Sequence, residues 1–98
     1  MTITKTVNGS ELCLFIDGRI DANTAALLET ELNGSLEGVT NLTLDLKDMH
    51  YISSAGLRVL LTAQKRMMTK GGMRVVNVCE AVMDVFEMTG FADILTIE

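Results

Sequence analysis

The chain has no proline, only one histidine and only two cysteines among its 98 residues. With His50 alone, a multi-histidine metal site lacks its ligands, and a histidine-based catalytic triad would depend on this one residue. Cys13 and Cys79 show no C-x-x-C or metal-binding spacing, and each lies in an apolar segment that we expect to be a strand. We therefore expect two buried, reduced thiols, no metal and no other cofactor.

Long hydrophobic runs are also missing. No apolar segment approaches the roughly 20 residues that a membrane-spanning helix needs. The first residues, Met1–Lys5, alternate as a strand does and contain no hydrophobic signal-peptide core. These features predict a cytoplasmic protein without membrane insertion.

Linkers, low-complexity segments and internal repeats are absent as well. A chain of 98 residues that is 48% hydrophobic suits one compact domain with one core. We expect residues 1–98 to form this single domain.

The net charge is −5, but all charged residues from Arg58 to Arg74 are basic. These bases fall on the polar side of one predicted helix, and the acidic remainder of the surface would repel a phosphate backbone. A solvated helix face explains the pattern, and we expect no direct contact with nucleic acid.

The pattern of apolar residues predicts an α/β protein. Asn8-Gly9 separates two apolar strands and is the strongest short signal for a β-hairpin, with a type I′ turn. Beyond the hairpin, strands alternate with helices, which predicts parallel strands joined by right-handed crossovers. The expected elements are strands over 2–7, 12–16, 41–46, 73–78 and 93–97, with helices over 24–36, 55–70 and 80–88. We thus predict a mixed sheet of about five strands, the first antiparallel and the others parallel, packed with three to four helices.

Both long helices should bury one apolar stripe. The expected inward residues are Leu27, Leu28, Leu32 and Leu36 in the first helix, and Leu57, Leu60, Leu61, Gln64 and Met68 in the second.

Ligands and partners of an open parallel sheet gather at the carboxyl ends of its strands. Three strand-to-helix junctions should meet at that edge, over 17–23, 47–54 and 78–80. If the second and third strands are neighbours, Asp21 and Ser54 lie on adjoining loops. Asp21 is a candidate helix cap and also a candidate functional contact, and both roles are compatible.

Ser53 and Ser54 form a hydroxyl pair at the start of the second long helix. Such a pair caps the helix, holds a phosphate or is itself phosphorylated. A capping box is absent, because Gly56 and Leu57 stand where a glutamate or glutamine is needed. The local sequence alone favours a plain cap. Gly56 either admits a partner close to the backbone or permits tight packing of the helix on the sheet.

The segment from Asp45 to Leu61 resembles the signature of STAS domains, the family that includes bacterial anti-anti-sigma factors. That signature is a strand of the type hLDL, a loop and (D/S)-S-(S/T/A)-G-L. The resemblance extends over nearly the whole chain, through Gly18-Arg-Ile-Asp21, which is similar to the family's G-x-h-D segment, and through the pattern over 82–95. It implies the STAS fold, with Ser54 at the position of the regulatory phosphoserine and Asp21 close to it.

The resemblance implies a non-enzymatic anti-sigma factor antagonist that acts in transcription regulation. The unphosphorylated domain would bind an anti-sigma factor with GHKL-type serine kinase activity and so release a sigma factor. Phosphorylation of Ser54 would dissolve the complex, a PP2C-type phosphatase would reset it, and ATP would belong to the kinase. The expected partner-binding residues are Asp21, Met49, Tyr51, Ser53, Ser54, Ala55, Gly56, Leu57 and Arg58.

The chain departs from many family members at two positions. Ser53 stands in place of an aspartate, and Ala55 in place of serine or threonine. The first change removes an acid that would help present the hydroxyl, and it leaves Ser53 as a competing acceptor.

Two other functions stay open at this point. One is a soluble STAS subunit of a lipid-transport ABC transporter, in which the domain is structural. The other is a phospho-aspartate receiver built on acids near the same edge, Asp17, Asp21, Asp45 and Asp48. A receiver needs a lysine late in the chain, but Arg74 is the only base after Lys70.

Overall fold

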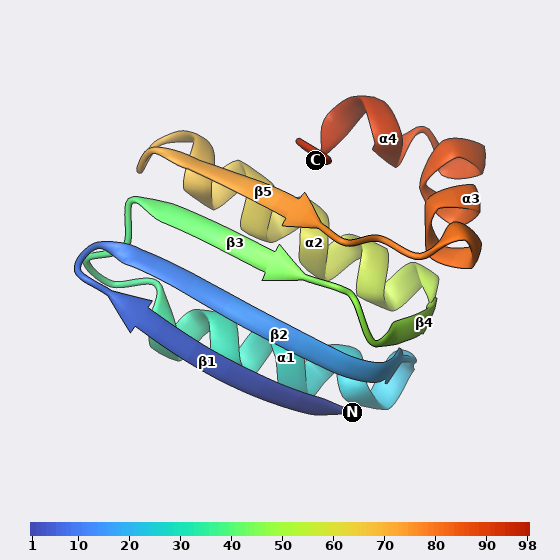
Figure 1. The fold of residues 1–98 in the computed structure, drawn as a ribbon, viewed down its shortest axis with the longest axis horizontal. Helices are drawn as coiled ribbons and strands as arrows, with labels where there is room; N and C mark the ends of the chain where they lie inside the picture. The colour runs from blue at the N-terminus through green and yellow to red at the C-terminus, as the bar shows by residue number, and fades with distance from the viewer.

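The computed structural model describes residues 1–98 as one α/β unit with four helices and five strands (Figure 1). Its elements are β1 (Thr2–Asn8), β2 (Glu11–Ile20), α1 (Ala22–Ser35), β3 (Asn41–Asp45), β4 (Met49–Ile52), α2 (Ser54–Met68), β5 (Gly72–Val76), α3 (Glu80–Thr89) and α4 (Phe91–Ile94).

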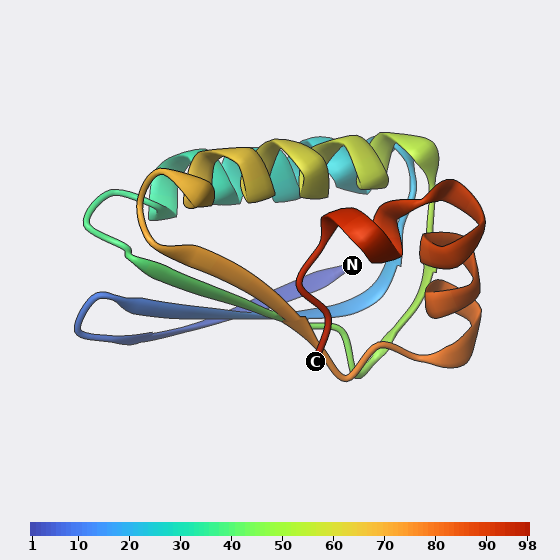
Figure 2. The same ribbon diagram turned by 90° about the horizontal axis from the view of Figure 1, so that it is seen from above.

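The sheet runs in the order β1-β2-β3-β5, and β4 pairs with β2. β1 is antiparallel to β2, and all other pairs are parallel, which confirms the predicted mixed sheet. Seen from above, the long helices α1 and α2 lie side by side on one face, and α3 stands at the end of the sheet beside β4 (Figure 2). No helix combines the length and the apolar character required to cross a membrane.

The predicted hairpin is confirmed, although its turn differs from the expected type. Asn8 pairs with Glu11, so the loop consists of Gly9 and Ser10. Only Gly9 has a positive φ, of 63°. This pattern is that of a type II′ turn, in which glycine takes the first central position, rather than type I′.

The second strand of the hairpin, β2, is longer than expected and pairs with two further strands besides β1. Glu11–Phe15 pairs with β3, and Gly18–Ile20 pairs with β4. The register shifts between Gly18 and Arg19, where Gly18 has a φ of 103°. The sequence had predicted loops over 17–23 and 47–54. The four residues of β4 are too few to show a strand pattern, and they include the exposed His50 and Tyr51.

The predicted C-terminal strand over 93–97 is wrong. Gly90 ends α3 in the left-handed region, at a φ of 82°, and the chain then forms α4. Leu95 is buried against the core, and only Ile97 forms a single parallel bridge with Val75. The fifth strand of the sheet is β4 instead.

One core of 24 buried residues joins the sheet to the helices. The predicted inward faces need two corrections. Leu27 is 60% exposed and Met68 is 70% exposed, whereas Met67 is fully buried. Met67 lies seven residues after Leu60, which returns to the same side of an α-helix, and Met68 is turned by about 100° from it.

Candidate functional site

The candidate site lies where β2 and β4 end side by side and lead into α1 and α2. Ile20 is the register partner of Ile52, and the Ser53 N–H donates to the Ile20 carbonyl at 2.8 Å. The starts of the two helices are thereby fixed next to each other. The expected neighbourhood of Asp21 and the serine pair is confirmed. The predicted junction over 78–80, which precedes α3, also reaches this edge, since the Cys79 thiol donates to the Met49 carbonyl at 3.3 Å.

Asp21 is the N-cap of α1. Its Oδ1 accepts from the Asn23 and Thr24 N–H groups at 3.0 and 2.9 Å, and Thr24 Oγ1 accepts from the Asp21 N–H at 2.8 Å. The hydrogen bond from the Thr24 backbone is the main reason that the pKa of Asp21 lies below its ordinary value. The cap role of Asp21 is therefore confirmed, and its second carboxylate oxygen stays outside the two capping bonds.

The two serines have different positions. Ser53 is the N-cap of α2, and its Oγ accepts from the Gly56 N–H at 3.3 Å. Ser54 is the first residue of the helix, it is exposed, and its hydroxyl takes no part in the cap. An incoming macromolecule can therefore reach Ser54, while the Ser53 hydroxyl is engaged and only half-exposed.

Three of the predicted contact residues belong to the core. Met49 is fully buried, because its side chain points inward from β4, and Leu57 is also buried. A Cβ atom on Gly56 would lie 2.7 Å from the side chains of Ile20 and Ile52. Gly56 thus permits close packing of α2 on the sheet. These three residues are corrected from surface to interior.

Arg19 is a site residue that the sequence reasoning missed. Its guanidinium carbon lies 4.5 Å from the centre of the Tyr51 ring, and its Nε lies 4.0 Å from Asp21 Oδ2. Arg19 and Tyr51 are register partners across β2 and β4. This contact follows from the pairing of those strands, and it could not be predicted because the sequence did not indicate β4.

We call the accessible part of the site the Ser54 surface, and its residues are Arg19, Asp21, Tyr51, Ser54, Ala55 and Arg58. It continues into a shallow groove of about 150 Å³ between the first turns of α1 and α2. The groove is lined by Ala22, Ala25, Ala26, Glu29, Ala55, Arg58 and Val59. The groove is thus lined mainly by apolar residues with one acid and one base, which suits a protein partner better than a small polar substrate.

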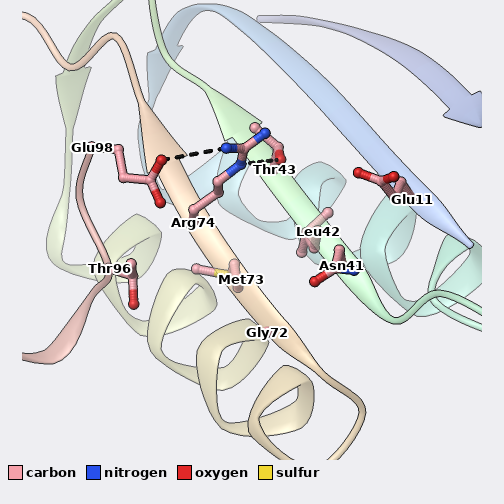
Figure 3. Close-up of a pocket in the computed structure, with 9 residues that line it drawn as sticks. All are labelled: Glu11, Asn41, Leu42, Thr43, Gly72, Met73, Arg74, Thr96 and Glu98. Atoms are coloured by element: carbon pink, nitrogen blue, oxygen red, sulfur yellow. Dashed lines mark hydrogen bonds and ion pairs between the residues drawn. The ribbon is translucent and has the colours of Figure 1, made fainter.

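A second recess, of about 480 Å³, lies at the opposite ends of the strands (Figure 3). Two of its three charged residues, Arg74 and Glu98, are already engaged: the Arg74 Nε donates to Thr43 Oγ1 at 3.0 Å, and its Nη1 lies 3.3 Å from Glu98 Oε1. None of the site residues predicted from the sequence lines this recess.

The acids considered for a receiver do not form a metal centre. No group of three or more His, Cys, Asp or Glu side chains is placed to hold a metal ion. Asp45 instead accepts from Asn77 Nδ2, just after β5, at 3.2 Å and from the Lys47 N–H of its own loop at 3.1 Å. The cysteines are free as expected, but half-buried rather than buried, and Cys79 is the N-cap of α3 rather than a strand residue.

The fold and this junction define a known class of domain. The STAS domain model matches residues 2–98, and the chain belongs to the STAS family.

Among individual proteins, the chain is 32% identical over 91 residues to the anti-sigma-B factor antagonist of Bacillus subtilis, covering 92% of this chain and 84% of that protein. Two solved structures have similar folds. An anti-sigma factor antagonist from Mycobacterium paratuberculosis gives a TM-score of 0.88 at 22% identity, with 98% of this chain and 83% of that one covered. The Bacillus cell fate determinant SpoIIAA in its phosphorylated form gives 0.76 at 13% identity, with 99% and 91% covered.

Proposed function

We propose that this domain is an anti-sigma factor antagonist switched by phosphorylation of Ser54. The unphosphorylated Ser54 surface binds an anti-sigma factor with GHKL-type serine kinase activity, and a sigma factor is released. The kinase brings ATP and transfers its γ-phosphoryl group to the Ser54 hydroxyl, and a PP2C-type phosphatase removes it. The domain itself is no enzyme, and it acts in the cytoplasm. The relatives named as anti-sigma factor antagonists support this proposal.

The observation that carries the proposal is the position of Ser54. Its hydroxyl is exposed at the first residue of α2 and lies outside the cap, which is supplied by Ser53. Free N–H groups and the helix dipole favour negative charge at this end, so a phosphate leaves the domain folded.

A bound partner would experience the same phosphate differently. The group adds a charge of about −1.5 to −2 and is strongly hydrated. Burying it without a matching cation costs several kcal/mol, and each 1.4 kcal/mol changes the dissociation constant about tenfold. Phosphorylation therefore weakens any complex that covers Ser54.

The acceptor is tested by incubating the purified domain with its candidate kinase and ATP and mapping the phosphate by mass spectrometry. We expect one phosphate, on Ser54. Ser54→Ala abolishes the transfer and keeps the fold and partner binding. Ser53→Ala serves as the matched control: it loses the cap, with about 1 kcal/mol of stability, and still accepts phosphate at position 54. Label on Ser53 alone would overturn the assignment.

The switch is tested by binding measurements with the unmodified anti-sigma factor. We expect Ser54→Asp to weaken binding at least tenfold, because a charge replaces the hydroxyl within the interface. Met68→Asp places the same charge at an exposed position of α2, about four turns from Ser54 and far from Arg58, and should bind like the wild type. Equal affinities for all three proteins would contradict the proposal.

A further inference from the structure

We infer that Arg58 is the residue that holds the phosphate of phosphorylated Ser54. The inference rests on the proposed function, since it assumes modification at Ser54, and it goes further by assigning a phosphate-binding residue within this domain.

The first argument is position. Ser54 and Arg58 are both exposed on α2 and are four residues apart. Residues at that spacing are neighbours on one helix face, with Cβ atoms about 5–6 Å apart. The acidic group would precede the basic one along the helix, which is the favourable order for such a pair.

The second argument is availability. Most other bases on α2 and after it are engaged: Arg66 donates to Asn33, Lys70 to the Leu36 carbonyl, and Arg74 to Thr43 and Glu98. The ion pairs in the structure join Arg19 to Asp21 and Arg74 to Glu98, so Arg58 has none. Lys65 is also exposed and free of such contacts, but it lies eleven residues from Ser54, about 16 Å along the axis.

The third argument is chemistry. A guanidinium presents a planar fork of donors that matches two phosphate oxygens, and such bidentate pairs are stronger than neutral hydrogen bonds. Glu29 on α1 lines the same groove as Arg58, is the groove's one acid and could compete with the phosphate for the guanidinium. A phosphate carries nearly twice the charge of a carboxylate, so at equal distance it attracts Arg58 more strongly than Glu29 does.

A consequence for the switch follows from the same geometry. In the unmodified domain, Arg58 lines the groove that continues the Ser54 surface. Once Arg58 turns toward a phosphate on residue 54, the groove loses one of its two charged residues. Phosphorylation then alters the docking surface twice, by adding an anion and by withdrawing a cation.

The test uses domain in which phosphoserine is incorporated at position 54 during translation, so no kinase is needed. Melting temperatures are compared with and without the phosphate in wild type, Arg58→Gln, Arg58→Lys and Lys65→Gln. We expect Arg58→Gln to reduce the phosphate-dependent gain in melting temperature by about 2–4 °C. Lys65→Gln should keep the gain, and Arg58→Lys should keep part of it. In NMR spectra, the Arg58 Nε–H signal should shift and exchange more slowly only when residue 54 is phosphorylated.

An equal phosphate-dependent gain in wild type and Arg58→Gln, with an unmoved Nε–H signal, would overturn the inference. A fifth variant, Arg19→Gln, tests the other arginine of the Ser54 surface. A phosphate-dependent gain in melting temperature that is lost in Arg19→Gln and kept in Arg58→Gln would also overturn the inference. These outcomes are independent of the kinase assay on Ser54. The phosphate-binding role and the proposed function therefore fail or survive separately.

Discussion

At the scale of single residues, the site depends on a division of labour between neighbouring side chains. Ser53 satisfies a backbone N–H of α2, and this frees the Ser54 hydroxyl for other contacts. Asp21 does for α1 what Ser53 does for α2. Sequence reasoning left both roles of Asp21 open and identified the accessible serine only through the family resemblance. An N-cap and its successor differ in backbone geometry rather than in residue type.

Asp21 should make stability depend on pH at the acid end. Its pKa in the folded domain is below the ordinary value, so the ionised carboxylate contributes stability above about pH 4 that is lost as the pH falls through the folded pKa. Asp21→Asn keeps an N-capping oxygen and removes the charge. We expect the wild type to exceed Asp21→Asn in melting temperature at pH 7, and the difference to shrink between pH 4 and pH 2.

Asp21→Ala is the matched control for the cap itself. It should be less stable than Asp21→Asn at every pH, since alanine accepts no hydrogen bond. A wild-type advantage over Asp21→Asn that grows as the pH falls would contradict the sign of this prediction.

At the scale of elements, α2 sits on the sheet at a distance that only glycine permits at position 56. A Cβ there would lie 2.7 Å from side-chain carbons of Ile20 and Ile52. We expect Gly56→Ala to lower the free energy of unfolding by about 1–3 kcal/mol, because either the helix or the two isoleucines must shift. Chemical denaturation measures the change.

Gly34→Ala provides the comparison within a helix. Gly34 lies in α1, and a Cβ there meets nothing within 4 Å. This substitution should stabilise the domain by about 0.5–1 kcal/mol, because alanine favours the helix. A stabilised Gly56→Ala would mean that the contact between α2 and the sheet is looser than described.

The helices and strands also show which parts of the fold can be predicted from the sequence. The two long helices, α1 and α2, and the strictly alternating strand β3 were predictable within two residues at each end. β4 and α4 were not, because four residues carry too little periodicity to separate strand, helix and loop. Of the Ser54 surface, Asp21, Tyr51, Ser54, Ala55 and Arg58 were predictable. The burial of Met49 and the contact of Arg19 with Tyr51 depend on β4, so they followed only from the folded chain.

At the scale of the whole molecule, a single core joins the C-terminal helices α3 and α4 to the sheet. Phe86 on α3 is fully buried and belongs to the same cluster as the strands and α2. We expect Phe86→Ala to lower the unfolding free energy of the entire domain by about 3–5 kcal/mol. Far-UV and near-UV circular dichroism should report one common transition at the lower midpoint.

Met88→Ala on the same helix is the control. Met88 is 86% exposed, and its replacement should change stability by no more than about 0.5 kcal/mol. Two separate unfolding transitions in Phe86→Ala, with α3 unfolding before the sheet, would show that α3 and α4 form a subdomain of their own.

β2 pairs with β1, β3 and β4, and this arrangement determines where the chain tolerates an inserted residue. Residues before its register shift align the hairpin and β3, whereas the two after it, Arg19 and Ile20, set the spacing between the two helix starts. An extra residue at the exposed tip, beside Gly9, lengthens a loop and leaves both alignments in place. An extra residue between Gly18 and Ile20 reverses which side chains face inward and carries Asp21 away from Ser53. Insertions should therefore leave the fold intact at one end of this strand and separate the residues of the Ser54 surface at the other.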